Sequence, residues 1–190
     1  LVLRERAGVY EIRCNGWDLM SNRAHASEET MAREALSMLG GRPAPRILIG
    51  GLGMGFTLRA ALGAATDDAR IEVAELVPEI VAWNRGPLAP LAGRPLEDPR
   101  VSVHVGDVAQ RFAAGAPWDA ILLDTDNGPE GLTQARNNRV YSHRGLRSAY
   151  DALRPNGILA VWSTDPDAPF TKRLGMAGFR AKEEEGVAHG

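Results

Sequence analysis

Residues that could bind a ligand follow several apolar runs of this chain. Residues 46–62 read RILIGGLGMGFTLRAAL, in which an apolar run leads into four glycines within six residues and then into a helix-like pattern. A turn without side chains lets a ligand lie against the backbone, and the following helix offers it free N–H groups. Glycine turns also occur for purely structural reasons, so this pattern alone leaves both readings open.

Carboxylates at the ends of the next apolar runs favour the ligand reading. Glu75 comes 20 residues after Gly55, the spacing at which an acid meets ribose hydroxyls in dinucleotide-type folds. Asp107 ends the run in VHVGDVA, and Asp124 ends the run in AILLDTDNGPEG. Because ligands of open α/β sheets bind outside the carboxyl ends of the strands, we expect one crevice that takes a nucleoside. Glu75 by itself could equally be an acid at a helix start.

The elements that position these residues alternate in type. Short apolar runs rich in β-branched residues occur at Ile47–Ile49, Ile71–Ala74, Val101–Val105, Ala120–Leu123 and Ile158–Trp162. Helical patterns separate most of them, at Gly55–Leu62, Pro78–Leu88 and Ser142–Leu153. This alternation predicts an α/β, Rossmann-like fold with a mostly parallel sheet. The continuous apolar character of the runs predicts helices on both faces of that sheet.

A small N-terminal unit precedes this pattern. Asn15-Gly16 predicts a two-residue turn in a β-hairpin over residues 9–21, and a helix capped by Ser27 follows. We therefore divide the chain into a hairpin and helix, residues 1–42, and a Rossmann-like catalytic domain, residues 43–190. We expect the C-terminal edge of that domain to be incomplete. Trp17 is a candidate wall of the substrate pocket.

Composition excludes several classes of protein. The 190 residues carry a net charge of −2 with a pI of about 6.1, which argues against a nucleic-acid binder. The single cysteine, Cys14, excludes an internal disulfide, and the four histidines fit no metal spacing. The sequence contains no apolar stretch long enough to cross a bilayer. We expect a cytoplasmic protein with no metal, no nucleic-acid partner and no membrane partner.

Five segments together resemble the spermidine synthases, the polyamine aminopropyltransferases. They are ILIGGLGMGFTLRAAL, VAELVPEIVAWNRGPL, LEDPRVSVHVGDVAQRF, WDAILLDTDNGPEGL and YSHRGLRSAYDALRPNGILAVWS, and they cover roughly residues 46–163 in order. The resemblance implies the class I S-adenosylmethionine-dependent methyltransferase fold. It also implies a homodimer and transfer of an aminopropyl group from decarboxylated S-adenosylmethionine to a small amine, with release of methylthioadenosine.

The resemblance also implies roles for individual residues. Glu75 would bind the ribose, Asp107 the exocyclic amine of adenine, and Asp124 the attacking amine. Asp126 would raise the pKa of Asp124 by like-charge repulsion, although it is also a plausible turn residue. The predicted catalytic residues are therefore Asp124 and Asp126. The predicted cofactor-binding residues are Gly50, Gly51, Gly53, Gly55, Glu75, Asp107 and Val108.

Two departures from the family keep other functions open. Spermidine synthases read G-G-G-D-G-G in the glycine turn, and that Asp contacts the aminopropyl amine; here Gly53 takes its place. The family's D-S-[ST]-D also becomes Asp124-Thr125-Asp126-Asn127. The glycine turn is closer to that of methyltransferases, which must leave room for a methionine carboxylate. The alternatives are a small-molecule methyltransferase that uses intact S-adenosylmethionine, and a non-catalytic nucleoside-binding protein.

Overall fold

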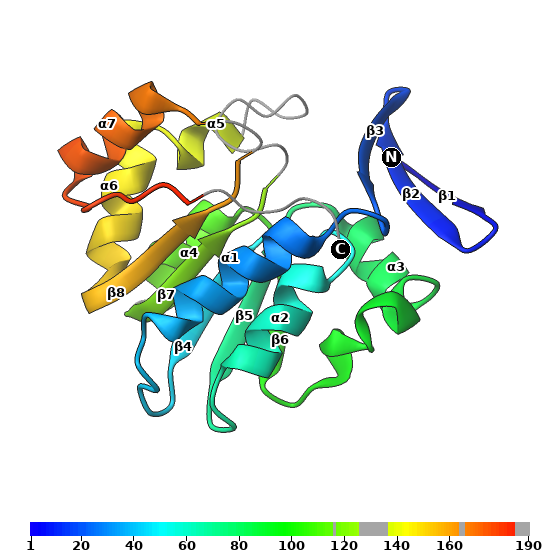
Figure 1. Ribbon diagram of the computed structural model, residues 1–190, viewed down its shortest axis with the longest axis horizontal. Coiled ribbons are helices and arrows are strands. Elements are labelled where there is room, and N and C mark those ends of the chain that lie inside the picture. Colours follow the sequence, from blue (N-terminus) through cyan, green and yellow to red (C-terminus); the bar gives the residue numbers. More distant parts are fainter. Residues whose placement is uncertain (116, 126–136, 164–165, 185–190) are drawn as a thin grey trace.

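The computed structural model describes residues 1–115, 117–125, 137–163 and 166–184. Its centre is a five-stranded sheet in the order β6-β5-β4-β7-β8, with every neighbouring pair parallel (Figure 1). The strands are β4 (Arg46–Gly50), β5 (Arg70–Glu75), β6 (Val101–Val105), β7 (Trp118–Leu123) and β8 (Leu153–Val161). The order reverses at β4, between β5 and β7, which is where ligands bind in folds of this kind.

Helices cover both faces of this sheet, as the sequence predicts. Alternate residues of β4 point to opposite faces, so Ile47 and Ile49 join one core cluster and Leu48 joins the other. The first cluster packs beneath α1 (Ala26–Ser37), α2 (Phe56–Ala64) and α3 (Pro78–Arg85). The second packs beneath α4 (Val108–Gly115), α5 (Asn137–Val140), α6 (His143–Ala152) and α7 (Ala168–Ala177). Two short 3-10 helices, η1 (Ala89–Ala92) and η2 (Pro95–Glu97), link α3 to β6.

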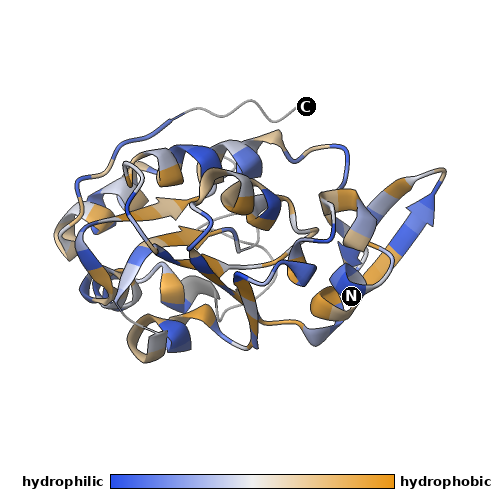
Figure 2. Ribbon diagram, turned by 90° about the horizontal axis from the view of Figure 1, so that it is seen from below, coloured by the Kyte–Doolittle hydropathy of each residue, from blue (hydrophilic) through white to orange (hydrophobic). Residues whose placement is uncertain are grey.

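The N-terminal segment forms a separate antiparallel sheet of three strands. They are β1 (Val2–Arg6), β2 (Val9–Cys14) and β3 (Trp17–Ser21), paired in the order β1-β2-β3. The predicted hairpin is β2-β3, and Asn15 and Gly16 turn with positive φ angles of 50° and 88°. The sequence prediction did not include β1, which pairs along the other edge of β2. This small sheet stands beside the body of the molecule in both views (Figures 1 and 2).

An apolar cluster attaches the small sheet to the larger unit. Ile12 of β2 is buried with Met54, Phe56 and Leu88, and Leu19 and Met20 of β3 pack against them. Burial of this apolar surface favours one fixed position of the small sheet over the glycine turn.

Helix α1 corrects one detail of the sequence prediction. The helix begins at Ala26 after His25, without a side-chain cap, and the Ser27 hydroxyl donates to the carboxylate of Glu28 at 3.2 Å. Ser27 therefore lies inside the first turn, and the prediction that it caps the helix is wrong. The helix packs against α2 and against β7 and β8, so it covers the parallel sheet.

A buried carboxylate ties the start of β4 to its neighbours. Asp119, in β7, is fully buried and accepts hydrogen bonds from the guanidinium of Arg42 at 2.6 Å and from the backbone N–H of Arg46 at 2.8 Å. The guanidinium of Arg154, in β8, lies 3.7 Å away. A buried charge without such partners is strongly unfavourable, so the position of these three segments depends on one side chain.

We expect Asp119→Ala to lower the free energy of unfolding by about 3 kcal/mol, because it leaves the half-buried guanidinium of Arg42 and the backbone N–H of Arg46 without their acceptor. Urea denaturation at pH 7 measures this change. Asp151→Ala is the matched control, since it removes an exposed ion pair to Arg147 and should cost little. Equal effects of the two variants would show that the Asp119 contacts do not hold the sheet together.

Candidate functional site

The glycine turn is held between the ends of two neighbouring strands. The N–H of Gly51 donates to the carbonyl of Ala74 at 2.9 Å, and the N–H of Asp124 donates to the carbonyl of Gly50 at 2.8 Å. These bonds continue the ladders of β4 with β5 and β7 beyond the strands themselves. The carboxyl ends of three strands are therefore fixed relative to one another.

Gly51 is required because two backbones meet there. Its φ is +93°, and a Cβ at this position would lie 2.1 Å from the carbonyl oxygen of Asp124. Such a distance is far inside van der Waals contact, and the carbonyl is backbone that cannot rotate away. Only glycine allows the turn to approach β7 this closely.

Glu75 is buried and binds the backbone of the turn. One of its carboxylate oxygens accepts from the N–H of Leu52 at 2.8 Å, and the other accepts from the N–H of Val77 at 2.8 Å. The carboxylate therefore joins the glycine turn to the start of α3. Glu75 also borders the cavity described below, together with Gly51 and Gly53.

Asp107 and Val108 lie at the end of β6. One carboxylate oxygen of Asp107 accepts from the N–H of Ala109 at 2.9 Å, which fixes the side chain at the start of α4. Val108 is buried, with its side chain packed close to Gly50. The two residues form the wall of the cavity next to β6.

Asp124 is a partly buried carboxylate with a raised pKa. It accepts a hydrogen bond of 2.5 Å from the hydroxyl of Thr57 in α2. Loss of contact with water raises the pKa of Asp124 to about 7; the Thr57 hydrogen bond opposes this rise, and the charges of Glu28 and Glu75 add to it. A carboxyl group of this kind exchanges its proton near neutral pH.

These residues border a single cavity. Gly51, Gly53, Glu75, Asp107, Val108 and Asp124 all line it. The structure thus brings together six of the predicted site residues from the ends of four strands. Their roles toward a ligand remain predictions.

Two other predicted site residues, Gly50 and Gly55, do not line the cavity. Gly50 faces Leu123 and Val108, and Gly55 faces Asn84, Ala92 and Pro95, so both serve packing and the path of the chain. Asp126 lies outside the described residues. Trp17 was also a candidate for the pocket wall, but its side chain is 73% exposed and does not line the cavity. That prediction is wrong.

The sequence interpretation missed several residues that do line the cavity. The small sheet contributes an apolar wall that includes Ile12, Cys14, Leu19 and Met20. Helix α1 contributes Glu28, from its first turn. Nothing in the spacing of these residues connects them to the glycine turn, because only the packing of the small sheet and of α1 brings them there.

Met20 fills the space beside Gly53. A Cβ at Gly53 would lie 2.7 Å from the terminal methyl of Met20 and 3.1 Å from its sulfur. The thioether of Met20, from β3, therefore lies where a side chain at position 53 would begin.

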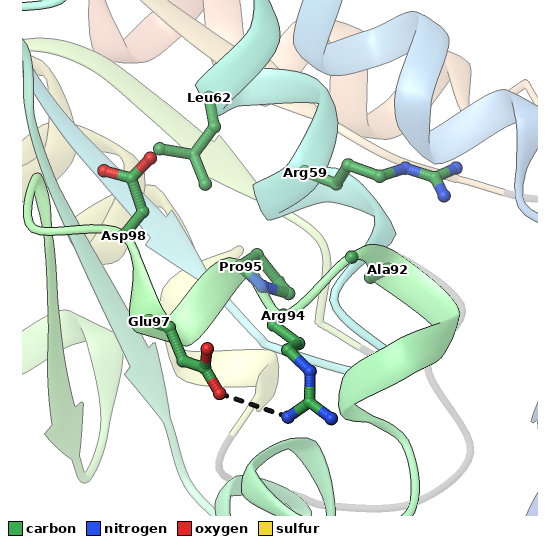
Figure 3. A pocket seen from close by; sticks show the side chains of 8 residues that line it. Arg59, Leu62, Ala92, Arg94, Pro95, Glu97 and Asp98 are labelled. Atoms are coloured by element: carbon green, nitrogen blue, oxygen red, sulfur yellow. Dashed lines mark hydrogen bonds and ion pairs between the residues drawn. The ribbon is translucent and has the colours of Figure 1, made fainter.

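A second hollow lies away from these residues, over α2, η1 and η2 (Figure 3). Its arginines are engaged: Arg94 pairs with Glu97 at 3.2 Å, and Arg59 pairs with Glu29 of α1. No predicted site residue lines it.

Among the described residues, no group of three or more His, Cys, Asp or Glu side chains is placed to hold a metal ion. No helix among the described residues is both long enough and apolar enough to cross a membrane.

Solved structures with the same fold include two spermidine synthases. That of Thermotoga maritima has a TM-score of 0.70 at 20% identity, over 89% of this chain and 56% of that one. A spermidine synthase in complex with the transition-state analogue AdoDATO has a TM-score of 0.59 at 20% identity, over 77% and 45%. Human methyltransferase-like protein 13 in complex with SAH has a TM-score of 0.55 at 18% identity, over 80% and 68%.

These similarities confirm the predicted fold. The chain has the class I S-adenosylmethionine-dependent methyltransferase fold, preceded by a small antiparallel sheet. It spans little more than half the length of the Thermotoga maritima spermidine synthase chain. No protein-family model and no curated protein sequence matches it.

We expect Gly51→Ala to destabilise the protein by at least about 2 kcal/mol, since it adds a backbone clash to an unfavourable φ angle. Gly63→Ala, in α2, is the matched control, because a Cβ there meets nothing within 4 Å and alanine favours a helix. Denaturant titration of both variants measures the difference. A stable Gly51→Ala protein would contradict the close approach of the turn to β7.

Proposed function

We propose that this protein is a spermidine synthase-like transferase that uses decarboxylated S-adenosylmethionine to alkylate a small amine and releases methylthioadenosine. The charge of the cavity carries this proposal. Glu28, Glu75, Asp107 and Asp124 line it, and no Lys or Arg side chain is among the described residues that do so. An acidic cavity of this kind favours a cationic ligand.

This charge distribution distinguishes two forms of the cofactor. Both forms carry a sulfonium and an ammonium group, but the intact form also carries a carboxylate. In a partly dehydrated cavity that carboxylate would meet four acidic side chains and no Lys or Arg of the described residues, which is unfavourable. The same side chains favour an amine as the acceptor.

The residues of the cavity fit an adenosyl group. Gly51 and Gly53 border the cavity with their backbone, and Glu75 and Asp107 provide acceptors for hydroxyl and amine hydrogens. We assign the ribose to Glu75 and the adenine amine to Asp107. When bound, the cofactor supplies an electrophilic carbon next to its sulfonium.

Asp124 is suited to prepare the acceptor. An amine is protonated near neutral pH and must lose a proton before its lone pair can attack. A carboxylate with a pKa of about 7 can bind the ammonium and then accept that proton. Alignment of the amine by the surrounding wall would supply further acceleration. We keep Asp126 as a second proposed catalytic residue, and a homodimer and a cytoplasmic location as predictions.

The methyltransferase alternative makes an opposite prediction for binding. We expect isothermal titration calorimetry to show that decarboxylated S-adenosylmethionine binds at least tenfold more tightly than the intact form, with methylthioadenosine also bound. Asp107→Asn is the control, because it should weaken all three nucleosides alike and leave their order unchanged. Tighter binding of the intact form would support methyl transfer. Absence of binding by all three would contradict an adenosyl site.

We expect turnover to depend on the ionised form of Asp124. Since the pKa of Asp124 in the ligand-free protein is about 7, kcat/KM should fall about tenfold for each pH unit below 7 and level off above it. Asp124→Asn should lose this pH dependence and reduce turnover at pH 8 by at least about 100-fold. A rate profile of both proteins with decarboxylated S-adenosylmethionine and 1,4-diaminobutane tests this. Retained turnover in the variant would contradict the assigned role.

The pH dependence of folding stability provides a second test of the raised pKa of Asp124. The raised pKa means that the folded protein holds the Asp124 proton more tightly than the unfolded chain. The stability that Asp124 contributes is therefore present below pH 3.8 and is lost as the pH rises through about 7. The melting temperature of Asp124→Asn relative to the original protein should increase between pH 5 and pH 8.

A further inference from the structure

One carboxylate of the cavity has no role in the proposed function. Glu75, Asp107 and Asp124 are assigned to ribose, adenine and the attacking amine, which leaves Glu28. This residue lies in the first turn of α1, on an element that comes from outside the glycine turn and its flanking strands. It borders the same cavity as Asp124.

Glu28 and its neighbour Glu29 have different surroundings. Glu29 forms ion pairs with Arg33, with Arg59 and with His25, and so links α1 to α2. Glu28 forms no ion pair among the described residues, and the Ser27 hydroxyl donates to it at 3.2 Å. Its negative charge is therefore not neutralised by a cationic side chain of the described part of the chain.

The charge of Glu28 reaches the reacting end of the cavity. Loss of water contact is the main cause of the raised pKa of Asp124, and the negative charges of Glu28 and Glu75 contribute to it. Two carboxylates that repel each other in a shared cavity are both stabilised when a ligand brings a positive charge between them. A diamine, or an amine together with an aminopropyl group, brings two such charges.

The glycine turn itself offers no acid for a second ammonium. In the family that this chain resembles, the residue in the place of Gly53 is an Asp that contacts the aminopropyl amine. Here the methyl and sulfur of Met20 fill the corresponding space. A buried ammonium without an anion is costly, so a second cationic nitrogen needs a carboxylate from another element.

We propose that Glu28 binds a second ammonium group of the substrates, distinct from the amine that attacks. This inference rests on the proposed function and deepens it. The ammonium belongs either to the aminopropyl group of the cofactor or to the far end of a diamine acceptor. The shared chemistry is a charge-assisted hydrogen bond between an ammonium and the Glu28 carboxylate.

The test compares Glu28→Gln with Glu34→Gln, a matched variant at an exposed position of the same helix. In one arm, calorimetry measures the binding of decarboxylated S-adenosylmethionine and of methylthioadenosine, which lacks the aminopropyl group. In the other, it measures the binding of 1,4-diaminobutane and of butylamine to protein saturated with methylthioadenosine. We expect Glu28→Gln to weaken the compound with the second ammonium at least tenfold in one arm and to leave its partner compound within twofold.

Each outcome decides the proposal. A selective loss in the first arm assigns the ammonium to the cofactor, and a selective loss in the second assigns it to the acceptor. Unchanged binding in both arms, or equal loss for both compounds of each pair, overturns the role of Glu28 while leaving the proposed function intact. If the unaltered protein binds neither nucleoside, the proposed function fails, and the inference fails with it.

Discussion

The candidate site depends on how closely two pieces of backbone approach each other at the centre of the sheet. The turn after β4 passes the carbonyl of Asp124 at a distance that leaves no room for a Cβ at Gly51. Hydrogen bonds from Gly51 to β5 and from Asp124 to β4 hold this arrangement, and the Glu75 carboxylate takes the next N–H of the turn, that of Leu52. The glycine turn and the two acids therefore form one rigid unit, in which a change at one member displaces the others.

The sequence is sufficient to predict this unit because its members are placed by local rules. Residues that end neighbouring parallel strands must lie at the same edge of the sheet, whatever the details of packing. Glu75, Asp107 and Asp124 could thus be assigned to one crevice from the apolar runs before them. The same rule does not predict the other contacts that such a residue makes. Glu75 accepts hydrogen bonds from the backbone of Leu52 and Val77, so it is a structural residue of the turn as well as a candidate ligand-binding residue.

The other walls of the cavity depend on contacts between segments far apart in the sequence. Glu28 and Met20 face the site because α1 lies on the sheet and because an apolar cluster fixes β3 above the turn. The ion pair of Arg42 with the buried Asp119 likewise joins residues that no local pattern relates. Local patterns also failed at Ser27 and Trp17, where the true helix start and the true inner face of the hairpin follow from packing.

The small sheet gives the site a route by which ligand preference can diverge during evolution. Its three strands pair only with one another within the described part of the chain, and side-chain packing joins it to the larger unit beyond the backbone that leads from β3 to α1. Substitutions at Leu19 or Met20 can therefore reshape one wall of the cavity without breaking a backbone hydrogen bond of the parallel sheet. In this architecture, ligand preference can diverge through a short hairpin while the strands beneath it stay constant.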